Sequence, residues 1–464
     1  MELMFHGAAR EVTGSCHVVR WKGKTILLDM GLFQGRRAEV RDKNTVLPVA
    51  VDTIDAVILS HAHIDHAGRL PLLARHGYRG PIFTTHATRD LCQVMLADSA
   101  HIQEKDAEFL ARRNRSHQEP LYDHTDVEAS VRCMRGVAYA TATEILPGLT
   151  LELLDAGHIL GSASVVIEWR DDHTKRRLAF SGDVGRSGLA IIRDPVIPTD
   201  VDGVIMESTY GNRDHSSVDG ARERLAAVVN ETAARGGKIL IPAFAVGRTQ
   251  ELIYTLHELV QAGKIPKIPV IIDSPLATAA TRVFSGNANL FDSTEPFVRE
   301  FRSDPGGVLE NELVEYTESI EASKAAMRRP GPMIVIAASG MVESGRILHH
   351  LLHGASDTRN TILIVGFQAE HTLGRRIVER QPRITVYGEA VDLRAQVEVL
   401  NGYSAHADRA GLAAWHASVR ATSPRLKHTW LVHGERSAQD EMAAAFSAKG
   451  ISVSCPSPGD RAVV

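Results

Sequence analysis

The chain has 464 residues, of which 44 % are hydrophobic and 23 % are charged, so it is an ordinary globular chain with room for two or three domains. Residues 1–10 include two charged side chains, and no apolar run reaches the ~18 residues that span a bilayer, which excludes a signal peptide and a membrane helix. We therefore expect a cytoplasmic protein. The formal net charge of −4 argues against a nucleic-acid coat protein but allows a nuclease, because bound metal or a local arginine cluster can hold phosphate.

The numbers and spacing of the cysteines and histidines limit the kinds of metal site and cross-link that the chain can form. The four cysteines, at positions 16, 92, 133 and 455, are far apart and never in C-x-x-C spacing. This excludes a thiolate zinc finger and argues against a disulfide framework. The 22 histidines are numerous, and several of them cluster within a few residues.

Strands alternate with helices in the first half of the chain. Short apolar runs bounded by polar residues predict buried strands at 24–30, 55–60, 81–84, 149–155, 164–169 and 178–181. Between residues 61 and 77 the pattern becomes helical through Leu70, Leu72 and Leu73. This interleaving predicts an α/β architecture with two layers of sheet.

A second α/β unit begins near residue 213. Its pattern predicts helices at 220–235 and 248–262 and strands at 238–242, 269–273, 333–338 and 361–366. The repeated β–α alternation predicts a small parallel sheet flanked by helices, which runs to about residue 401. The remainder again holds a helix and a strand, at 428–432. We therefore expect a domain at 213–401 inserted into a domain built from 1–212 and 402–464.

The densest histidine cluster is the run S-H-A-H-I-D-H-A-G at 60–68, directly after a predicted strand. His61 and His63, two residues apart, can face one metal, while Asp65 and His66 can face another. Imidazole nitrogen and carboxylate oxygen suit Zn²⁺, and an N/O ligand set with an open position is of the catalytic type. A histidine-rich surface loop is the alternative that the run alone leaves open.

This run resembles the signature motif of the metallo-β-lactamase superfamily. The resemblance implies an α/β fold, the αβ/βα sandwich, with two zincs at its edge. Asp29, which ends K-T-I-L-L-D, matches the aspartate that orients the metal-binding loop. His158 in D-A-G-H-I-L-G matches the next ligand, and Asp183 in F-S-G-D-V-G matches the carboxylate that bridges both metals. Taken alone, these two residues would fit a packed histidine and a turn aspartate.

The second half resembles the β-CASP branch of that superfamily, in which the inserted domain is found in nucleases. Glu207 in M-E-S-T-Y-G-N, His406 in S-A-H-A-D and His433 in L-V-H-G-E match its three successive motifs. Between them, parts of the inserted domain are matched by segments 242–248, 339–341 and 366–375. Members that act on RNA carry histidine in the third motif, whereas members that repair DNA cross-links carry valine, so His433 implies RNA.

The resemblance implies two zincs per chain with a shared carboxylate. One zinc is expected on His61, His63 and His158, and the other on Asp65, His66 and His433, with Asp183 bridging both. Two such cations can hold a shared water, lower its pKa to around 7 and grip a phosphoryl oxygen. The leaving 3′ oxygen needs a proton, and His406 oriented by Glu207 is the expected general acid. A purely structural ion pair is the alternative for these two residues.

Contacts to the substrate are expected from the inserted segments and from the second motif. The candidates are Arg248, Ser339, Gly340, Arg346, His371, Arg375, Arg376 and Ser404. The arginines offer planar donor forks for phosphate, although each of them also fits a solvated helix face. Because aromatics make up only 5 % of the chain, we expect single-stranded RNA to be bound through phosphates rather than by base stacking.

Together these features predict an endoribonuclease that leaves 5′-phosphate and 3′-hydroxyl ends and works as a monomer or homodimer. Internal cutting is expected because only about thirty residues follow the third motif and no extension precedes the first strand. In this the chain resembles compact members related to the nuclease subunit of the pre-mRNA 3′-end cleavage machinery.

Three alternatives remain open at this point. They are a 5′-to-3′ exoribonuclease of the ribonuclease J type, a small-molecule hydrolase that opens a lactam, lactone or thioester, and a non-catalytic scaffold. An insertion of ~190 residues argues against the small-molecule enzyme, which needs only a small lid. The presence of every expected metal ligand argues against the scaffold.

Overall fold

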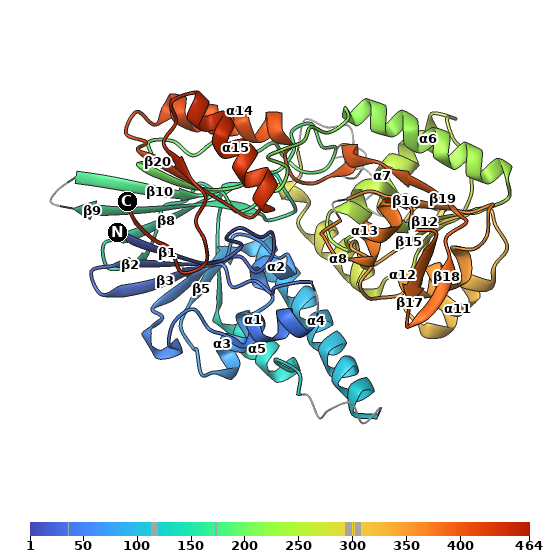
Figure 1. Cartoon of the computed structure of the whole chain (residues 1–464), viewed down its shortest axis with the longest axis horizontal. Coiled ribbons are helices and arrows are strands. Elements are labelled where there is room, and N and C mark those ends of the chain that lie inside the picture. The colour runs from blue at the N-terminus through green and yellow to red at the C-terminus, as the bar shows by residue number, and fades with distance from the viewer. Residues whose placement is uncertain are drawn as a thin grey trace. The chain divides into compact units, whose positions relative to one another are not determined.

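The computed structural model describes residues 1–35, 37–112, 119–171, 174–292, 299, 301, 308–366 and 368–464 (Figure 1). The chain divides into two compact units, which are described separately. The first unit comprises Met1–Ser187, Asp194–Asp214 and His406–Val464, and the second comprises Gly188–Arg193 and His215–Ala405. None of the helices in the described part of the chain combines the length and apolarity needed to cross a bilayer.

Among the described residues, the first unit contains two seven-stranded mixed sheets. The first sheet has the order β22 (Arg461–Val463), β1 (Glu2–Gly7), β2 (Cys16–Trp21), β3 (Lys24–Leu28), β4 (Ala56–Ile58), β5 (Ile82–Thr85) and β6 (Met134–Val137). The second has the order β21 (Val453–Ser454), β20 (His428–Val432), β11 (Gly203–Glu207), β10 (Thr174–Phe180), β9 (Ala163–Asp171), β8 (Leu149–Asp155) and β7 (Thr143–Leu146). The chain ends meet in the first sheet, where β22 pairs antiparallel with β1.

Residue alternation along the strands explains why the two sheets pack against each other. On β9, Val165 and Ile167 belong to the core between the sheets, together with Leu28 of β3, while Val166 faces the other side. Successive side chains of a strand point to opposite faces, so a strand covered on both sides is apolar throughout. The core of the first unit therefore lies between the sheets, with a second apolar layer under the helices.

Helices cover both outer faces of the first unit. They are α1 (Arg37–Thr45), the 3₁₀ turn η1 (Val51–Thr53), α2 (Ile64–Ala67), α3 (Leu70–Arg75), α4 (His86–Arg112), α5 (His124–Cys133), α14 (Arg409–Thr422) and α15 (Arg436–Ala448). Figure 1 shows α14 and α15 on the side of the sheet that contains β20, and α3, α4 and α5 on the side of the other sheet. Trp415 and Phe446 anchor α14 and α15 to the second sheet. This layering is the αβ/βα sandwich expected from the sequence.

The second unit is built on a parallel sheet. Within the described residues its strands are β14 (Val314–Tyr316), β13 (Val270–Ile272), β15 (Met333–Ala337), β12 (Lys238–Pro242), β16 (Thr361–Ile364) and β19 (Gln396–Val399), in that order. All neighbouring pairs in this sheet are parallel. A separate antiparallel hairpin is formed by β17 (Arg383–Val386) and β18 (Glu389–Asp392). The small parallel sheet predicted from the β–α alternation is confirmed.

The helices of the second unit follow its strands in the usual β–α order. They are α6 (Val218–Ala234), α7 (Arg248–Gln261), α8 (Pro275–Gly286), η2 (Ala288–Leu290), α11 (Ile320–Arg328), α12 (Ile347–Gly354), α13 (Leu373–Val378) and η3 (Asn401–Tyr403). Ser217, Ser274 and Ser319 cap the N-termini of α6, α8 and α11 by accepting a backbone N–H bond. Such caps satisfy donors that the first helical turn leaves unpaired.

Most predicted elements differ from the observed ones by a few residues at their ends, and two of these differences concern the motifs. The strand expected at 24–30 ends at Leu28, because Asp29 takes a left-handed backbone conformation with φ of 59°. The helical pattern at 61–77 is two short helices, α2 and α3, preceded by a non-helical stretch that carries His61 and His63. In both places the chain leaves regular structure at the residues that the motifs singled out.

Candidate metal centre

The motif residues gather at one edge of the sandwich because they follow strand ends. His158, Asp183 and His433 lie one to three residues beyond the ends of β8, β10 and β20, and Glu207 is the last residue of β11. These four strands run in one direction, since β8 and β10 are both antiparallel to β9 while β10, β11 and β20 are mutually parallel neighbours. Loops after strand ends that share an edge converge, and ligands bind there in many α/β proteins.

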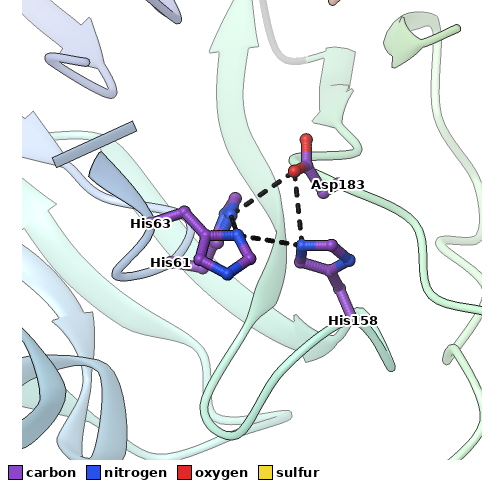
Figure 2. Close-up of side chains that lie close together, drawn as sticks. All are labelled: His61, His63, His158 and Asp183. Atoms are coloured by element: carbon purple, nitrogen blue, oxygen red, sulfur yellow. Dashed lines mark hydrogen bonds and ion pairs between the residues drawn. The ribbon is translucent and has the colours of Figure 1, made fainter. Parts of the chain in front are cut away.

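The first group of ligand atoms is formed by His61, His63, His158 and Asp183. Figure 2 shows the three rings and the carboxylate pointing toward one another. The Nδ1 atom of His63 lies 3.1 Å from the Nε2 atoms of both His61 and His158. Those two Nε2 atoms each lie 3.4 Å from Oδ2 of Asp183. The four atoms therefore enclose a space with the size of a single ion.

The second group is formed by Asp65, His66, His433 and the other oxygen of Asp183. The Nε2 atoms of His66 and His433 are 3.0 Å apart, and they lie 3.3 and 3.6 Å from Asp183 Oδ1. Oδ2 of Asp65 lies 3.4 Å from His433 Nε2. Burial acts to raise the pKa of Asp183, but His433 and His66 hold it well below its ordinary value. Oδ2 of Asp183 therefore lies in the first group of ligand atoms, and Oδ1 lies in the second.

Both groups have the dimensions of a zinc shell. Ligand atoms ~2.0–2.1 Å from a tetrahedral zinc lie ~3.3 Å from one another, which is close to the measured separations of 3.0–3.6 Å. Oδ1 of Asp183 is buried and accepts no hydrogen bond from the described residues. A buried carboxylate oxygen without a donor is costly unless an ion satisfies it. The residues present therefore fit two divalent ions of the zinc class.

The pKa values of the histidines in the two groups depend on burial and on the neighbouring carboxylates. Burial lowers the pKa of His61 well below its ordinary value and that of His63 to about 4, so these rings are neutral, as metal ligands must be. For His66, burial acts to lower the pKa, but the carboxylates of Asp183 and Asp29 outweigh it and raise the pKa well above its ordinary value. The surroundings of His66 therefore favour positive charge at this point.

Asp29 binds the loop that carries His61, His63 and His66 through hydrogen bonds to Ser60 and His66. Its Oδ1 accepts the backbone N–H of Ser60 at 2.8 Å, and its Oδ2 accepts the hydroxyls of Ser15 and Ser60 at 3.0 Å. The same Oδ2 lies 2.7 Å from Nδ1 of His66, which leaves His66 Nε2 to face His433. A carboxylate on the far nitrogen fixes the orientation of a ligand histidine.

Two glycines permit the close approach of these loops. A Cβ atom at Gly31 would lie 1.6 Å from the carbonyl oxygen of Asp65. A Cβ atom at Gly185 would lie 1.7 Å from the carbonyl oxygen of Gly157, next to His158. Any side chain at either position would displace a loop that carries a ligand atom.

The buried Glu207 and the half-buried His406 form a pair beside the first group. Nδ1 of His406 lies 3.1 and 3.2 Å from the two oxygens of Glu207, and Glu207 also accepts the backbone N–H of Val184 at 2.6 Å. Burial acts to lower the pKa of His406, but Glu207 and Asp183 raise it to about 9. The His406 ring is therefore charged at neutral pH and lies with its centroid 4.5 Å from that of His158.

Thr209 was not assigned a role from the sequence, although it stands within the motif around Glu207. Its hydroxyl donates to the backbone carbonyl of His433 at 3.1 Å and lies 3.0 Å from His433 Nδ1. Since the hydroxyl hydrogen is engaged, Nδ1 donates to Thr209 and Nε2 is left free to bind metal. Only the proximity of a polar residue to a motif glutamate could have pointed to Thr209.

The arginines expected to hold phosphate belong to the second unit, where three of them have intramolecular partners. Arg248 is buried and donates to Glu251 at 2.5 Å. Arg375 donates to Glu379 at 3.0 Å and to the backbone carbonyl of Gln368 at 3.3 Å.

Arg346 is the most firmly held of these arginines. It donates to Asp273 at 2.7 Å and to the backbone carbonyls of Thr317 and Glu318 at 3.0 Å each. Its guanidinium is therefore held by groups of the second unit itself, and a contact to phosphate stays a prediction.

The other candidate residues for substrate contact also lie in the second unit. Ser339 Oγ accepts the backbone N–H of Glu343 at 3.2 Å, and the Gly340 carbonyl accepts the side-chain amide of Gln368 at 2.8 Å. His371 is exposed with φ of 70°, and Ser404 is buried. Arg376 is half-buried on α13. Phe367, within the matched segment 366–375, lies outside the described residues.

Comparisons with known proteins agree with this geometry along the whole chain. Residues 9–78 match the metallo-beta-lactamase superfamily, residues 249–377 match the Beta-Casp domain, and residues 390–456 match the Zn-dependent metallo-hydrolase RNA specificity domain. Ribonuclease TTHA0252 of Thermus thermophilus is 38 % identical to the chain over 465 residues, and the match covers 98 % of each protein.

More distant relatives extend the same pattern. Transcription termination factor FttA of Methanosarcina mazei is 30 % identical over 453 residues, which cover 96 % of this chain and 68 % of that protein. A solved structure of a protein of unknown function from Enterococcus faecalis shares the fold at 11 % identity, with a TM-score of 0.52 over 100 % of this chain and 99 % of that chain. The family expected from the motifs is confirmed: the chain belongs to the β-CASP branch of the metallo-β-lactamase superfamily of hydrolases.

Proposed function

We propose that the chain is a ribonuclease that uses two zincs to hydrolyse RNA phosphodiester bonds. The observation that carries the proposal is the pair of ligand groups that share Asp183, each with the spacing of a tetrahedral zinc shell. Support for RNA comes from the match to an RNA specificity domain at 390–456 and from the ribonuclease that is similar over almost the whole chain. The histidine in the third motif, His433, points the same way.

The ligand assignment follows from the two groups. One zinc would be held by His61, His63 and His158, the other by Asp65, His66 and His433, with one oxygen of Asp183 on each. When bound, such a pair supplies an activated water and Lewis acidity toward a phosphoryl oxygen. Asp29 and Thr209 would set the ring orientations of His66 and His433 through their far nitrogens.

His406 is the proposed general acid. Glu207 holds its Nδ1, and the Nε2–H of the charged ring is the proposed proton donor. The proton would go to the 3′ oxygen as the P–O3′ bond breaks, which gives a 3′-hydroxyl on one product and a 5′-phosphate on the other. Since water is the nucleophile, the RNA 2′-hydroxyl takes no part in the bond change.

The test of this function is product mapping on end-labelled single-stranded RNA with purified, zinc-loaded protein. We expect fragments with 5′-phosphate and 3′-hydroxyl ends. Fragments with 2′,3′-cyclic phosphate ends would mean that the 2′-hydroxyl is the nucleophile and would overturn the mechanism. Turnover of a β-lactam or thioester with intact RNA would overturn the substrate class.

Internal cutting is the finer part of the proposal. It rests on the resemblance to compact members of the family that was drawn from the sequence, since the ribonuclease that matches over 98 % of both proteins is named without a mode of cutting. A covalently closed RNA circle has no end to thread, so linearisation by wild-type protein and not by an Asp65→Ala variant is the expected result. A circle that survives while linear 5′-monophosphate RNA is degraded to mononucleotides would make the enzyme a 5′-to-3′ exoribonuclease.

Several sequence expectations stay predictions. They are an inserted domain at 213–401, a cytoplasmic location, a monomer or homodimer, and contacts to RNA through Arg248, Arg346, His371, Arg375, Arg376, Ser404 and the backbone around Ser339 and Gly340.

A further inference from the structure

The first unit contains a second, separate set of metal-ligating side chains. His101, Glu104 and His124 each offer a ligand atom, and these atoms lie within 4.8 Å of one another. His101 and Glu104 are three residues apart on α4 and so share one face of the helix, while His124 is the first residue of α5. Glu104 Oε2 lies 3.9 Å from His124 Nε2. None of these residues belongs to the catalytic cluster.

Buried hydrogen bonds fix the two helices to each other at this point. The hydroxyls of Tyr122 and Ser99 are 2.7 Å apart, and both side chains are buried. Gln103 accepts the backbone N–H of Leu121 at 3.1 Å and donates to Ser99 at 3.4 Å. The segment that leads into α5 is thereby held against α4, so the backbone that carries the three ligand residues is fixed by contacts that involve no metal. Preorganised ligands bind metal with less loss of conformational entropy.

The start of α5 is equally well defined. Asp123 caps the helix by accepting the backbone N–H groups of Thr125 at 2.8 Å and Asp126 at 3.1 Å, and Asp126 caps in return. The N-terminus of a helix carries a partial positive charge, which these carboxylates offset beside the ring of His124. The local charge is therefore compatible with a cation.

A further carboxylate lies one turn before His101 on the same helix. Asp98 and His101 are three residues apart on α4, a spacing that brings two side chains of a helix together. Ligand histidines commonly have a carboxylate beside them that increases their basicity. Asp98, His101 and Glu104 form a row at three-residue spacing along one face of α4.

We propose that His101, Glu104 and His124 bind a third divalent metal, a zinc, on the surface of the first unit. Two imidazole nitrogens and one carboxylate oxygen are the donors that zinc prefers, whereas calcium and magnesium require oxygen shells. The fourth position is left to water because the His101 and His124 side chains are exposed. This exposure makes the site weaker than the catalytic cluster, most of whose ligands are buried.

The direct test is equilibrium dialysis of the protein, already loaded with two zincs, against increasing free zinc, with metal per chain measured by mass spectrometry. Wild type is expected to take up one additional zinc. His101→Ala and His124→Ala are expected to lose it, whereas His76→Ala, which removes an exposed histidine elsewhere in the first unit, retains it. No additional zinc in wild type, or equal uptake by all four proteins, overturns the proposal.

Two further variants separate coordination from a general effect of charge or folding. Glu104→Gln is expected to weaken the additional zinc at least tenfold, while Glu104→His, which restores a ligand atom, keeps it. Asp98→Asn is expected to weaken it about tenfold, the usual worth of an outer carboxylate. In Asp183→Ala the additional zinc stays even though the catalytic zincs are lost, so failure here is distinguishable from failure of the proposed ribonuclease. Equal affinities in Glu104→Gln and Glu104→His would remove Glu104 from the site.

Discussion

Two buried aspartates at strand ends, Asp183 in the first unit and Asp273 in the second, have opposite surroundings. Asp273 follows β13 and accepts hydrogen bonds on both oxygens, at 2.5 Å from Thr317 and at 2.7 Å from Ser323, Arg346 and His350. Around Asp183 the neighbours are histidine nitrogens at 3.3–3.9 Å, and its Oδ1 accepts no hydrogen bond from the described residues.

Asp273 belongs to an ion-pair cluster in which both carboxylate oxygens have donors, whereas one oxygen of Asp183 accepts no hydrogen bond from the described residues. Donors at hydrogen-bond distance satisfy Asp273, and no additional ligand is required there. The nitrogen atoms around Asp183 are spaced like the edges of a tetrahedral shell, which fits a cation at the centre of each group. Both aspartates have a lowered pKa, so the shift alone does not tell a functional carboxylate from a structural one.

The largest expected effect comes from Asp183→Ala, which removes the carboxylate shared by both groups. Zinc content should fall at both sites and RNA cleavage should be abolished, while the fold stays intact because Asp183 satisfies no donor network of its own. Metal analysis, circular dichroism and an RNA cleavage assay measure these three quantities. Two tightly bound zincs in this variant would contradict the bridging assignment.

His406→Ala should leave the zinc content unchanged but reduce turnover by roughly 10²–10⁴-fold, the usual contribution of a proton donor. An RNA with sulfur in place of the leaving 3′ oxygen needs no proton and should partly restore the rate. Zinc loss in the variant would instead make His406 a ligand. Intact zinc without rescue by the sulfur substrate would make it a binding residue.

Asp273→Ala reverses the pattern expected at Asp183. Removal of this carboxylate leaves Arg346 and His350 without their partner in the interior, which should lower the unfolding free energy of the second unit by about 3–5 kcal/mol. Zinc content should stay at the wild-type value. Chemical denaturation followed by metal analysis gives both numbers, and an unchanged stability would mean that the Asp273 cluster does not hold the second unit together.

Thr209→Val tests a smaller contribution within the metal centre. Without the hydroxyl, His433 Nδ1 loses its partner and the ring its fixed orientation, so zinc affinity should fall about 10- to 100-fold at one site only. Competition with a chelator of known affinity resolves the two sites. Equal weakening at both sites would place Thr209 outside this role.

The smallest effect concerns acid stability. Although burial acts to raise the pKa of Asp273, its hydrogen-bond partners, His350 first, lower it below the ordinary carboxyl value of about 3.9. A depressed carboxyl pKa contributes stability that is present above the unfolded value and is lost as pH falls below it. The wild-type unfolding free energy should therefore drop below pH ~4 by up to ~1.4 kcal/mol per pH unit more than that of Asp273→Asn. Parallel pH profiles would show that Asp273 is not the group responsible.

Much of the fold was predictable because its strands are buried runs with clear ends. The strands at 149–155, 238–242 and 428–432 have the predicted limits, since each is apolar and bounded by polar or turn residues. A first strand close to Met1 was expected without stated limits, and it lies at Glu2–Gly7 with the alternating burial of a strand that has one buried face. The left-handed turn at Asp29 could not be foreseen, because non-glycine residues rarely adopt it.

The residues of the candidate site were predictable to different degrees. The ligand histidines and Asp183 stand in compact motifs, and the strand directions bring these motifs to one edge. The arginines carried no comparable information, because a sequence does not indicate whether a guanidinium meets phosphate or a carboxylate of its own chain. Arg346 illustrates this, since its partner Asp273 lies 73 residues away in the sequence.

The most direct test of the two-metal account is the rate of RNA cleavage by metal-stripped protein as zinc is added back in measured equivalents. The account predicts a rate that climbs until two zincs are bound per chain and then stays level, because both groups around Asp183 must be filled. A rate that is complete at one zinc per chain, or that is independent of zinc, would contradict it.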